Sequence, residues 1–387
     1  MLPEENKNHE FVATTLEGLE QILAEELLKI GARDIVPVRR AVRFNGDLGF
    51  LYKANKGLRT ALRILFPVLQ GNAANEQEYY DRIASIPWHK WIKDDQTFAV
   101  QAILNNAPIN HSHFAALKAK DAIADRIKKE RGTRPSIDTA NPHWSIHILW
   151  NKNRLQVSLD SSGKPLYKRG YKVAFGKAPL NECLASGIVL ASGWNGNGDV
   201  LDPFCGSGTL LTEAAMIAMN MPAGMYRSEY GFMNWPNFNP ELYDIIVNGM
   251  VNRIKETQYS FYGYDLNRRA VEDAQANIEN AMMEDYIKIR VGNFKDIKKP
   301  TAVGQIFTNP PYNTRISAEV VSLYGEIGTW LKHEFTGWSA SILAPDEEIQ
   351  AWKHIGLKAN RKVPLLNGSI SCKLMNYHLF SGGRKSQ

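Results

Sequence analysis

The stretch Val200-Leu-Asp-Pro-Phe-Cys-Gly-Ser-Gly-Thr209 decides the fold of the C-terminal half of the chain. A short apolar strand runs into a turn that contains two glycines, and a helical pattern begins at Thr209. Glycines let the backbone of such a turn approach a ligand closely. No Gly-Lys-Ser or Gly-Lys-Thr follows, and the spacing G-x-G-x-x-G is not kept. The turn therefore matches neither of these two nucleotide-binding motifs.

Helices and strands alternate regularly on both sides of this turn. We expect helices over 180–194, 209–219 and 268–282, and strands over 199–201, 261–264, 287–291 and 306–308. This alternation predicts an α/β domain over residues 179–387, with helices on both faces of a parallel sheet. Because right-handed crossovers bring the carboxyl ends of parallel strands to one edge, a ligand should bind at that edge.

The glycine turn resembles the D-x-F-x-G-x-G turn that follows the first strand of class I S-adenosylmethionine (SAM) methyltransferases. An ordinary strand-to-helix turn is the alternative. The resemblance implies a Rossmann-like sheet and SAM as the cofactor. The residues that it implies for cofactor binding are Asp202, Phe204, Gly206, Gly208, Asp265, Asn293 and Phe294. Asn293 departs from the usual acidic residue that meets the adenine amino group, although its amide oxygen can still accept a hydrogen bond.

Asp265 follows the next strand, in Phe261-Tyr-Gly-Tyr-Asp265. A carboxylate at this position can accept hydrogen bonds from both hydroxyls of a ribose, and such charge-assisted bonds are strong. The alternative is that Asp265 caps the helix that begins at Arg268.

The motif Thr308-Asn309-Pro310-Pro311-Tyr312 comes directly after the fourth strand of this half. Prolines fix the backbone and remove N–H donors, so the Asn309 amide oxygen and the Pro310 carbonyl are left as two acceptors. Two acceptors suit an exocyclic aromatic amine, and Tyr312 can stack on the base that carries it. We therefore expect Asn309, Pro310 and Tyr312 to be catalytic. A rigid strand-to-helix turn is the alternative.

Several other kinds of protein are excluded. The composition, with 44% hydrophobic and 22% charged residues, is that of ordinary globular domains. Neither a leader peptide nor an apolar run of about 18 residues is found, so we expect a cytoplasmic protein without membrane contact. The three cysteines lack C-x-x-C spacing, and none of the nine histidines stands at metal-ligand spacing. We expect neither a disulfide nor a bound metal, and we expect Cys205 to be a small core residue.

Positive charge is concentrated in the first part of the chain. Residues 1–172 carry a net charge of +7, and residues 173–387 carry −1. This asymmetry indicates that the first part contacts a polyanion, with a chance imbalance of a solvated surface as the alternative. The mixed order of strands and helices predicts α+β modules over about the first 160 residues. They include a basic helix over 112–131 and a pair of strands over 145–150 and 154–160.

Two segments stand outside this pattern. Residues 161–178 are rich in Gly, Lys, Tyr and Ser, and we expect a linker that carries contacts. Residues 225–238 form a long, aromatic connection in the C-terminal half. This connection could cover the substrate base, or it could pack its rings on the sheet as an Ω-loop.

Nearly the whole chain resembles the bacterial RlmL-type family, THUMP-domain guanine-N2 methyltransferases of large-subunit ribosomal RNA. The motifs that carry the resemblance are Ser158-Leu-Asp-Ser-Ser-Gly163, Tyr167-Lys-Arg-Gly-Tyr171, Ala178-Pro-Leu-Asn-Glu182, Asp202–Gly208, Asn309–Tyr312 and Asn376-Tyr-His378. The resemblance implies a ferredoxin-like part over 1–50, a THUMP RNA-binding domain over 51–160, the linker 161–178 and the methyltransferase domain 179–387. Unlike some members of this family, the chain should have no second methyltransferase domain.

The resemblance further implies transfer of a methyl group to N2 of a guanosine in 23S rRNA, either free or in a pre-ribosomal particle. The residues that we expect to contact this RNA are Lys118, Lys128, Lys129, Arg131, Lys168, Arg169 and Tyr171. A base inside a helix cannot reach a pocket at a sheet edge, so the target should be flipped or unpaired. Two alternatives stay open. One is methylation of tRNA guanine N2 or of adenine N6, and the other is a non-catalytic RNA-binding assembly factor.

Overall fold

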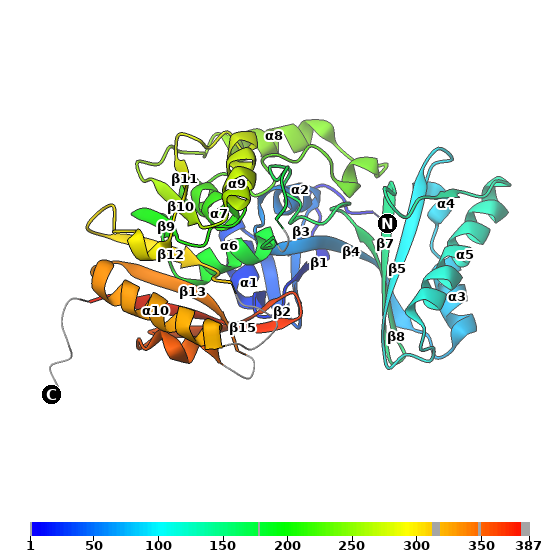
Figure 1. Cartoon of the computed structure of the whole chain (residues 1–387). Helices are drawn as coiled ribbons and strands as arrows, with labels where there is room; N and C mark the ends of the chain where they lie inside the picture. Colours follow the sequence, from blue (N-terminus) through cyan, green and yellow to red (C-terminus); the bar gives the residue numbers. More distant parts are fainter. Residues whose placement is uncertain (1, 177–178, 312–317, 347–349, 381–387) are drawn as a thin grey trace. The chain divides into compact units, whose positions relative to one another are not determined.

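The computed structural model describes residues 2–176, 179–311, 318–346 and 350–380 (Figure 1). The chain divides into two compact units. The first unit contains Met1–Thr15, Ala24–Leu166 and Arg227–Asn248, and the second contains Leu16–Leu23, Tyr167–Tyr226 and Gly249–Gln387. The boundary at Leu166 lies within the segment 161–178.

One eight-stranded sheet, in the order β2-β3-β1-β4-β8-β7-β5-β6, forms the first unit. Its strands are β1 (His9–Thr15), β2 (Arg33–Val38), β3 (Ala41–Gly46), β4 (Ala61–Asn72), β5 (Thr97–Asn105), β6 (Ser136–Ile137), β7 (Trp144–Asn151) and β8 (Arg154–Asp160). The long strand β4 pairs with β1 through its first half and with β8 from Leu65 to Asn72. The predicted ferredoxin-like and THUMP parts therefore share one sheet.

Several helices accompany this sheet. They are α1 (Glu20–Ile30), α2 (Leu48–Gly57), α3 (Glu76–Ala84), α4 (Trp88–Trp91) and α5 (Ser112–Arg131). The expected basic helix over 112–131 is confirmed as α5, which ends at Gly132 with a φ of +83°. A left-handed residue at this position is a common helix stop, and glycine adopts it without strain.

The second unit contains a seven-stranded sheet in the order β11-β10-β9-β12-β13-β15-β14. Its strands are β9 (Asp199–Asp202), β10 (Phe261–Asp265), β11 (Ile287–Val291), β12 (Gly304–Thr308), β13 (Ser339–Pro345), β14 (Arg361–Asn367) and β15 (Ile370–His378). The strands from β11 to β13 are parallel, as predicted. The antiparallel hairpin β14–β15, which extends the sheet from β13, was not predicted.

Helices cover both faces of the second sheet, which confirms the predicted Rossmann-like α/β class. They are α6 (Glu182–Ala191), α7 (Thr209–Ala218), α9 (Arg268–Asn280) and α10 (Ala318–Glu334), and α8 (Pro240–Val251) lies between α7 and β10 in the chain. Successive strand residues enter opposite cores: Val200 packs with α6, α7 and α9, whereas Leu201 packs with α10. Strands buried on both faces explain the near-continuous apolar runs in the sequence.

Candidate active site

The glycine turn between β9 and α7 has the conformation that its sequence requires. Gly206 and Gly208 have φ angles of +53° and +79°, which disfavour other residues. The Gly208 amide donates to the Cys205 carbonyl at 2.9 Å, and Gly208 is the N-cap of α7. A Cβ atom on Gly206 would meet no heavy atom within 4 Å. The backbone of the turn is therefore open on this side.

Asp265, the last residue of β10, fixes this turn. Its Oδ2 accepts a hydrogen bond from the Gly206 amide at 3.0 Å, and its Oδ1 accepts one from the Asn267 amide at 2.8 Å. The N-cap of α9 is Asn267, so the alternative role of Asp265 as the helix cap is wrong. Each carboxylate oxygen can accept more than one hydrogen bond, and Asp265 is only half-buried. A ligand on the turn can thus share this carboxylate.

Asp202 joins the glycine turn to the Asn-Pro-Pro motif. Its carboxylate is buried and accepts hydrogen bonds from the Thr308 hydroxyl at 2.8 Å and from the Phe204 amide at 3.1 Å. Burial, with a smaller contribution from Asp265, raises the pKa of Asp202 to about 7. Sequence reasoning missed Thr308, whose signal is a polar residue that directly follows the apolar pair Ile306-Phe307 at the end of the strand.

Asn309 follows β12 at the same sheet edge. Its amide oxygen is buried, and no described residue donates a hydrogen bond to it. Leaving a buried acceptor unsatisfied costs about 1–3 kcal/mol, so this atom indicates a place for a donor from elsewhere. Pro310 is buried beside it and Pro311 is exposed. The predicted stacking residue Tyr312 lies outside the described residues.

Two aromatic rings lie at the same edge. The Phe204 and Phe294 ring centroids are 5.1 Å apart, and Phe294 also meets the edge of Trp330 at 5.6 Å. Asn293 precedes Phe294, and its Oδ1 accepts a hydrogen bond from the Lys295 amide at 3.1 Å. The carboxyl ends of β9, β10 and β11 thus bring together the residues predicted to bind the cofactor.

Arg169 and Tyr171 do not lie where we expected them. Both side chains are buried, and both bind the buried carboxylate of Glu213 on α7, through the Arg169 Nε at 3.3 Å and the Tyr171 hydroxyl at 3.1 Å. The prediction that they contact RNA is therefore wrong, because an ion pair inside the core holds them. The apolar helix α7 carries Glu213 as its one charged residue, which is a signal for such a buried partner.

The other residues predicted to contact RNA differ in their exposure and in their hydrogen-bond and ion-pair partners within the protein. Lys128, Lys129 and Lys168 are exposed. Lys118 forms an ion pair with Glu76 at 2.8 Å. Arg131 donates to the Ile92 carbonyl at 2.6 Å and also to the His89 carbonyl, so it joins α5 to α4.

From Arg227 onward the aromatic connection packs within the first unit, whereas Met225 and Tyr226 pack on the core of the second unit. The Phe232 ring lies 4.6 Å from that of Tyr52, and Trp235 stacks on Trp144 at 6.2 Å. Phe232 and Trp235 are buried there. The second interpretation, packing on a sheet, is therefore correct, but the sheet is that of the first unit.

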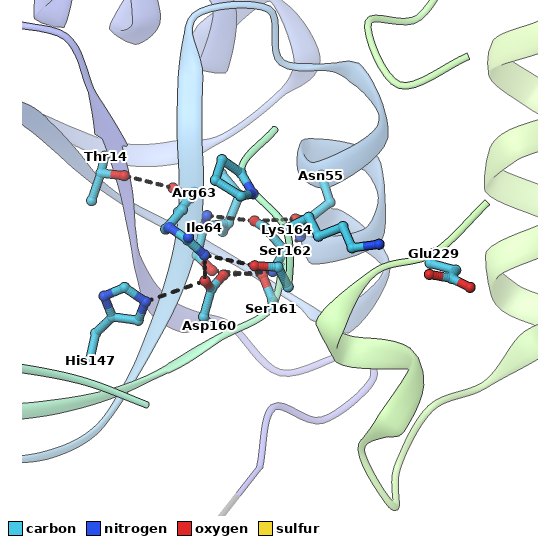
Figure 2. Close-up of polar contacts among 12 residues, drawn as sticks. Thr14, Asn55, Arg63, Ile64, His147, Asp160, Ser161, Ser162, Lys164 and Glu229 are labelled. Carbon is cyan, nitrogen blue, oxygen red and sulfur yellow. Dashed lines mark hydrogen bonds and ion pairs between the residues drawn. The ribbon is translucent and has the colours of Figure 1, made fainter. Parts of the chain in front are cut away.

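A buried polar network lies at the carboxyl end of β8 (Figure 2). The Asp160 carboxylate accepts hydrogen bonds from Arg63, from the His147 Nε2 at 3.3 Å and from the Ser162 amide at 2.8 Å. Burial alone would raise the pKa of Asp160, but the His147 hydrogen bond and the Arg63 charge outweigh it and lower the pKa. The Ser162 hydroxyl donates to Asn55 at 2.7 Å, so this network holds the start of segment 161–178 on the first unit.

Other kinds of site are not found in the parts of the chain that the structure describes. No group of His, Cys, Asp and Glu side chains there could hold a metal ion. Within those same parts, none of the helices combines the length and the apolar character needed to cross a bilayer. Cys183, Cys205 and Cys372 are buried, and none of them forms a disulfide. Burial raises the pKa of the Cys205 thiol, which disfavours a thiolate nucleophile.

Comparison with known families agrees with this geometry. Residues 169–376 match the family described as RMKL-like, methyltransferase domain. Residues 73–160 match the THUMP domain, and residues 10–65 match the RlmL ferredoxin-like domain.

Known relatives cover nearly the whole chain. A Synechocystis sp. protein that carries the name of an RNA methyltransferase is 35% identical over 373 residues, covering 96% of this chain and 97% of that protein. The ribosomal RNA large subunit methyltransferase K/L of Syntrophotalea carbinolica is 33% identical over 382 residues, covering 95% of this chain and 53% of that enzyme. The chain thus spans about half the length of the K/L relatives.

Solved structures show the same architecture. A protein described as a methyltransferase and solved with SAH has a TM-score of 0.87 at 28% identity, covering 98% of this chain and 100% of that one. A Listeria monocytogenes protein described as an N6-adenine-specific DNA methylase has a TM-score of 0.85 at 28% identity, covering 96% of this chain and 97% of that one. With the match over residues 169–376 and the Synechocystis relative, these findings show that the chain belongs to the RMKL-like methyltransferase family.

Proposed function

We propose that the chain methylates the exocyclic N2 of a guanosine in 23S rRNA. The observation that carries this proposal is the buried Asn309 amide oxygen, which accepts no hydrogen bond from the described residues and lies one residue after Thr308. The Thr308 hydroxyl binds Asp202 at the start of the glycine turn. A free acceptor next to a cofactor turn suits an amine that is to be methylated.

The described residues fit SAM, the cofactor of this family. The open backbone at Gly206 provides room for the ligand, and the neighbouring Asp265 carboxylate is our candidate acceptor for the ribose hydroxyls. Phe204 and Phe294 are candidates to pack on adenine. Asn293 is our candidate acceptor for the adenine amino group, in addition to the backbone amide from which its Oδ1 already accepts a hydrogen bond. When bound, SAM supplies an electrophilic methyl group.

The chain's own contribution is to hold the amine. The Asn309 amide oxygen and the Pro310 carbonyl accept the two N–H groups and thereby turn the nitrogen lone pair away from the base ring. Both oxygens also stabilise the positive charge that develops on this nitrogen, which is the usual role of preorganised acceptors. Tyr312 is expected to stack on the base. No residue is required to form a covalent bond to the substrate.

The choice of ribosomal RNA is supported by the names of the relatives, whereas the choice of guanine N2 rests on the sequence motifs that resemble guanine-N2 methyltransferases. The K/L relatives are named as ribosomal RNA large subunit methyltransferases, and the Synechocystis relative as an RNA methyltransferase. The THUMP match and the net charge of +7 over residues 1–172 support binding of RNA phosphates. Lys128, Lys129 and Lys168 are the exposed candidates. The target base is expected to be flipped or unpaired.

The domain limits are part of this proposal. We assign 1–50 to the ferredoxin-like part, 51–160 to the THUMP domain, 161–178 to the linker and 179–387 to the methyltransferase domain. The family matches at 10–65, 73–160 and 169–376 support this order.

A second candidate is methylation of adenine N6, because the Listeria monocytogenes neighbour is described as an enzyme of that kind. Mass spectrometry of nucleosides from rRNA and tRNA of cells with and without the protein separates the candidates. Loss of one N2-methylguanosine from 23S rRNA is the expected result, and loss of N6-methyladenosine or of a tRNA modification would overturn the assignment. Complementation with the Asn309→Ala variant is the control. If the methylated nucleosides of the two strains do not differ and the protein nevertheless binds RNA, the chain is an assembly factor.

A further inference from the structure

Three lysines surround one indole in the second unit. The Nζ atoms of Lys362, Lys373 and Lys353 lie 4.2, 4.9 and 5.6 Å from the ring centroid of Trp352. All three distances are within the range of a cation–π interaction, so the half-buried indole holds three ammonium groups close together. We call these four residues the lysine cluster.

Among the residues that the structure describes, Asp346 compensates part of the positive charge of the lysine cluster. Asp346 accepts hydrogen bonds from the Lys373 Nζ and from the Trp352 Nε1, each at 2.8 Å. Burial opposes ionisation of Asp346, but these hydrogen bonds outweigh it and lower its pKa, so the carboxylate stays charged. Within the described part of the chain, neither Lys353 nor Lys362 forms an ion pair, and both are exposed. The lysine cluster with Asp346 therefore carries a net charge of about +2.

The lysine cluster lies at the edge of the sheet that carries Asn309. Strand β13 is parallel to β12, with Ile342 opposite Thr308, so Pro345 and Asp346 extend past the level of Asn309. Lys373 lies on β15, opposite Ala344, and β15 is the next strand of the sheet (Figure 1). Neighbouring strands are about 4.8 Å apart, so β15 lies about 10 Å from β12, and β14, which carries Lys362, lies about 14 Å from it. A few nucleotides of RNA can span this distance.

We propose that the lysine cluster binds a backbone phosphate of the substrate RNA within a few nucleotides of the methylated one. The proposal deepens the proposed function and rests on it. Three ammonium groups held close together repel one another, and a phosphate relieves this repulsion while ammonium groups serve as its point-charge ligands. The second half of the chain has a net charge of −1, so its overall charge did not predict this site. A phosphate held here positions the strand without reading its sequence.

The test compares two double variants of the full chain. Lys353→Ala with Lys362→Ala removes two charges from the lysine cluster. Lys255→Ala with Lys288→Ala removes two exposed charges near the amino ends of β10 and β11 of the same sheet. Affinity for unmodified 23S rRNA transcript is measured by filter binding over a range of salt concentrations. We expect the first variant to lose about tenfold in affinity and to lower the salt slope by about one, because loss of one phosphate contact removes roughly 0.7 to 0.9 from that slope. The second should stay within about twofold of the wild type.

Equal effects of the two double variants would overturn the proposal. Replacement of both lysines by arginine should keep the affinity, and unchanged SAM affinity shows that the fold is intact. If the double alanine variant fails to fold, Lys362→Ala alone should lower the slope by about one. Failure of the proposed function would give a different result. If RNA binds through the lysine cluster but receives no methyl group, the proposed methyl transfer is refuted and the proposed phosphate site is retained.

Discussion

Two buried polar sites, one in each unit, differ in how completely they are satisfied. In the first unit, the Asp160 carboxylate receives hydrogen bonds from Arg63, His147 and the Ser162 amide. In the second unit, the Asn309 amide oxygen is buried without a donor among the described residues. A satisfied network stabilises and rigidifies a fold, whereas a buried acceptor without a partner costs stability and can be satisfied by a donor from a ligand.

The largest expected effect is on the satisfied site. Removal of one partner from a buried ion pair leaves the other charge uncompensated and typically costs about 3–5 kcal/mol. We therefore expect Asp160→Ala to lower the free energy of unfolding of the first unit by about that amount, measured by urea denaturation. SAM affinity should not change. A loss below about 1 kcal/mol would show that the network contributes little to stability, and Asp95→Ala, at an exposed carboxylate of the same unit, is the matched control.

The open site should respond in the opposite way. Asn309→Ala removes an acceptor that has no intramolecular donor, so stability should be unchanged or slightly higher. Turnover should fall by on the order of 10², because preorganised acceptors act chiefly on the transition state. Labelled methyl transfer at saturating SAM measures turnover, and calorimetry measures SAM affinity, which should stay intact. Undiminished turnover would remove the catalytic role of Asn309.

A third variant distinguishes an effect on cofactor binding from an effect on the site that holds the amine. Asp265→Ala should raise the Kd for SAM by about ten- to a hundredfold, since hydrogen bonds to a charged acceptor contribute about 1.5–3 kcal/mol. Turnover at saturating SAM should change less than in Asn309→Ala. Asp265→Asn keeps the size of the side chain and serves as the milder control. Calorimetry that shows unaltered SAM affinity would refute the assignment to the ribose.

The sequence predicted the parts of the site that depend on local order. Glycines in a strand-to-helix turn and polar residues after parallel strands have positions that the α/β alternation dictates, so Gly206 and Asp265 lie at the same sheet edge, although the hydrogen bond between them was not predicted. It did not predict contacts between distant segments. Thr308 and Asp202 are 106 residues apart, and the direction of the Arg169 side chain depends on where Glu213 lies in the folded core.

The same limit applies to the sheets. The strand β4 shows an apolar run in the sequence, but its pairing with both β1 and β8 is decided by tertiary contacts. The aromatic stretch 225–238 showed its need for burial, but its composition does not say which sheet buries it. Composition and periodicity indicate which apolar side chains must be buried. Which sheet or helix buries them depends on the whole fold.

The smallest expected effect concerns Asp202, which is buried like Asp160 but without a cation beside it. Its pKa of about 7 in the folded protein exceeds that of an unfolded chain, about 3.9. Between these values the folded state holds a proton that the unfolded state has released, so the stability due to this group is lost as the pH rises towards 7. We expect the wild type to lose about 1 kcal/mol relative to Asp202→Asn between pH 6 and pH 7.

The measurement is urea denaturation of both proteins at the two pH values. Asp346 is the matched control, because its pKa is lowered rather than raised. A lowered pKa contributes stability that is lost only as the pH falls well below 6, so the difference between wild type and Asp346→Asn should be constant over the same interval. If Asp202→Asn also shows a constant difference, Asp202 is ionised throughout. The Thr308 hydroxyl and the Phe204 amide would then be enough to hold a buried carboxylate in its charged form, and the contrast with the cation-paired Asp160 would lose its physical basis.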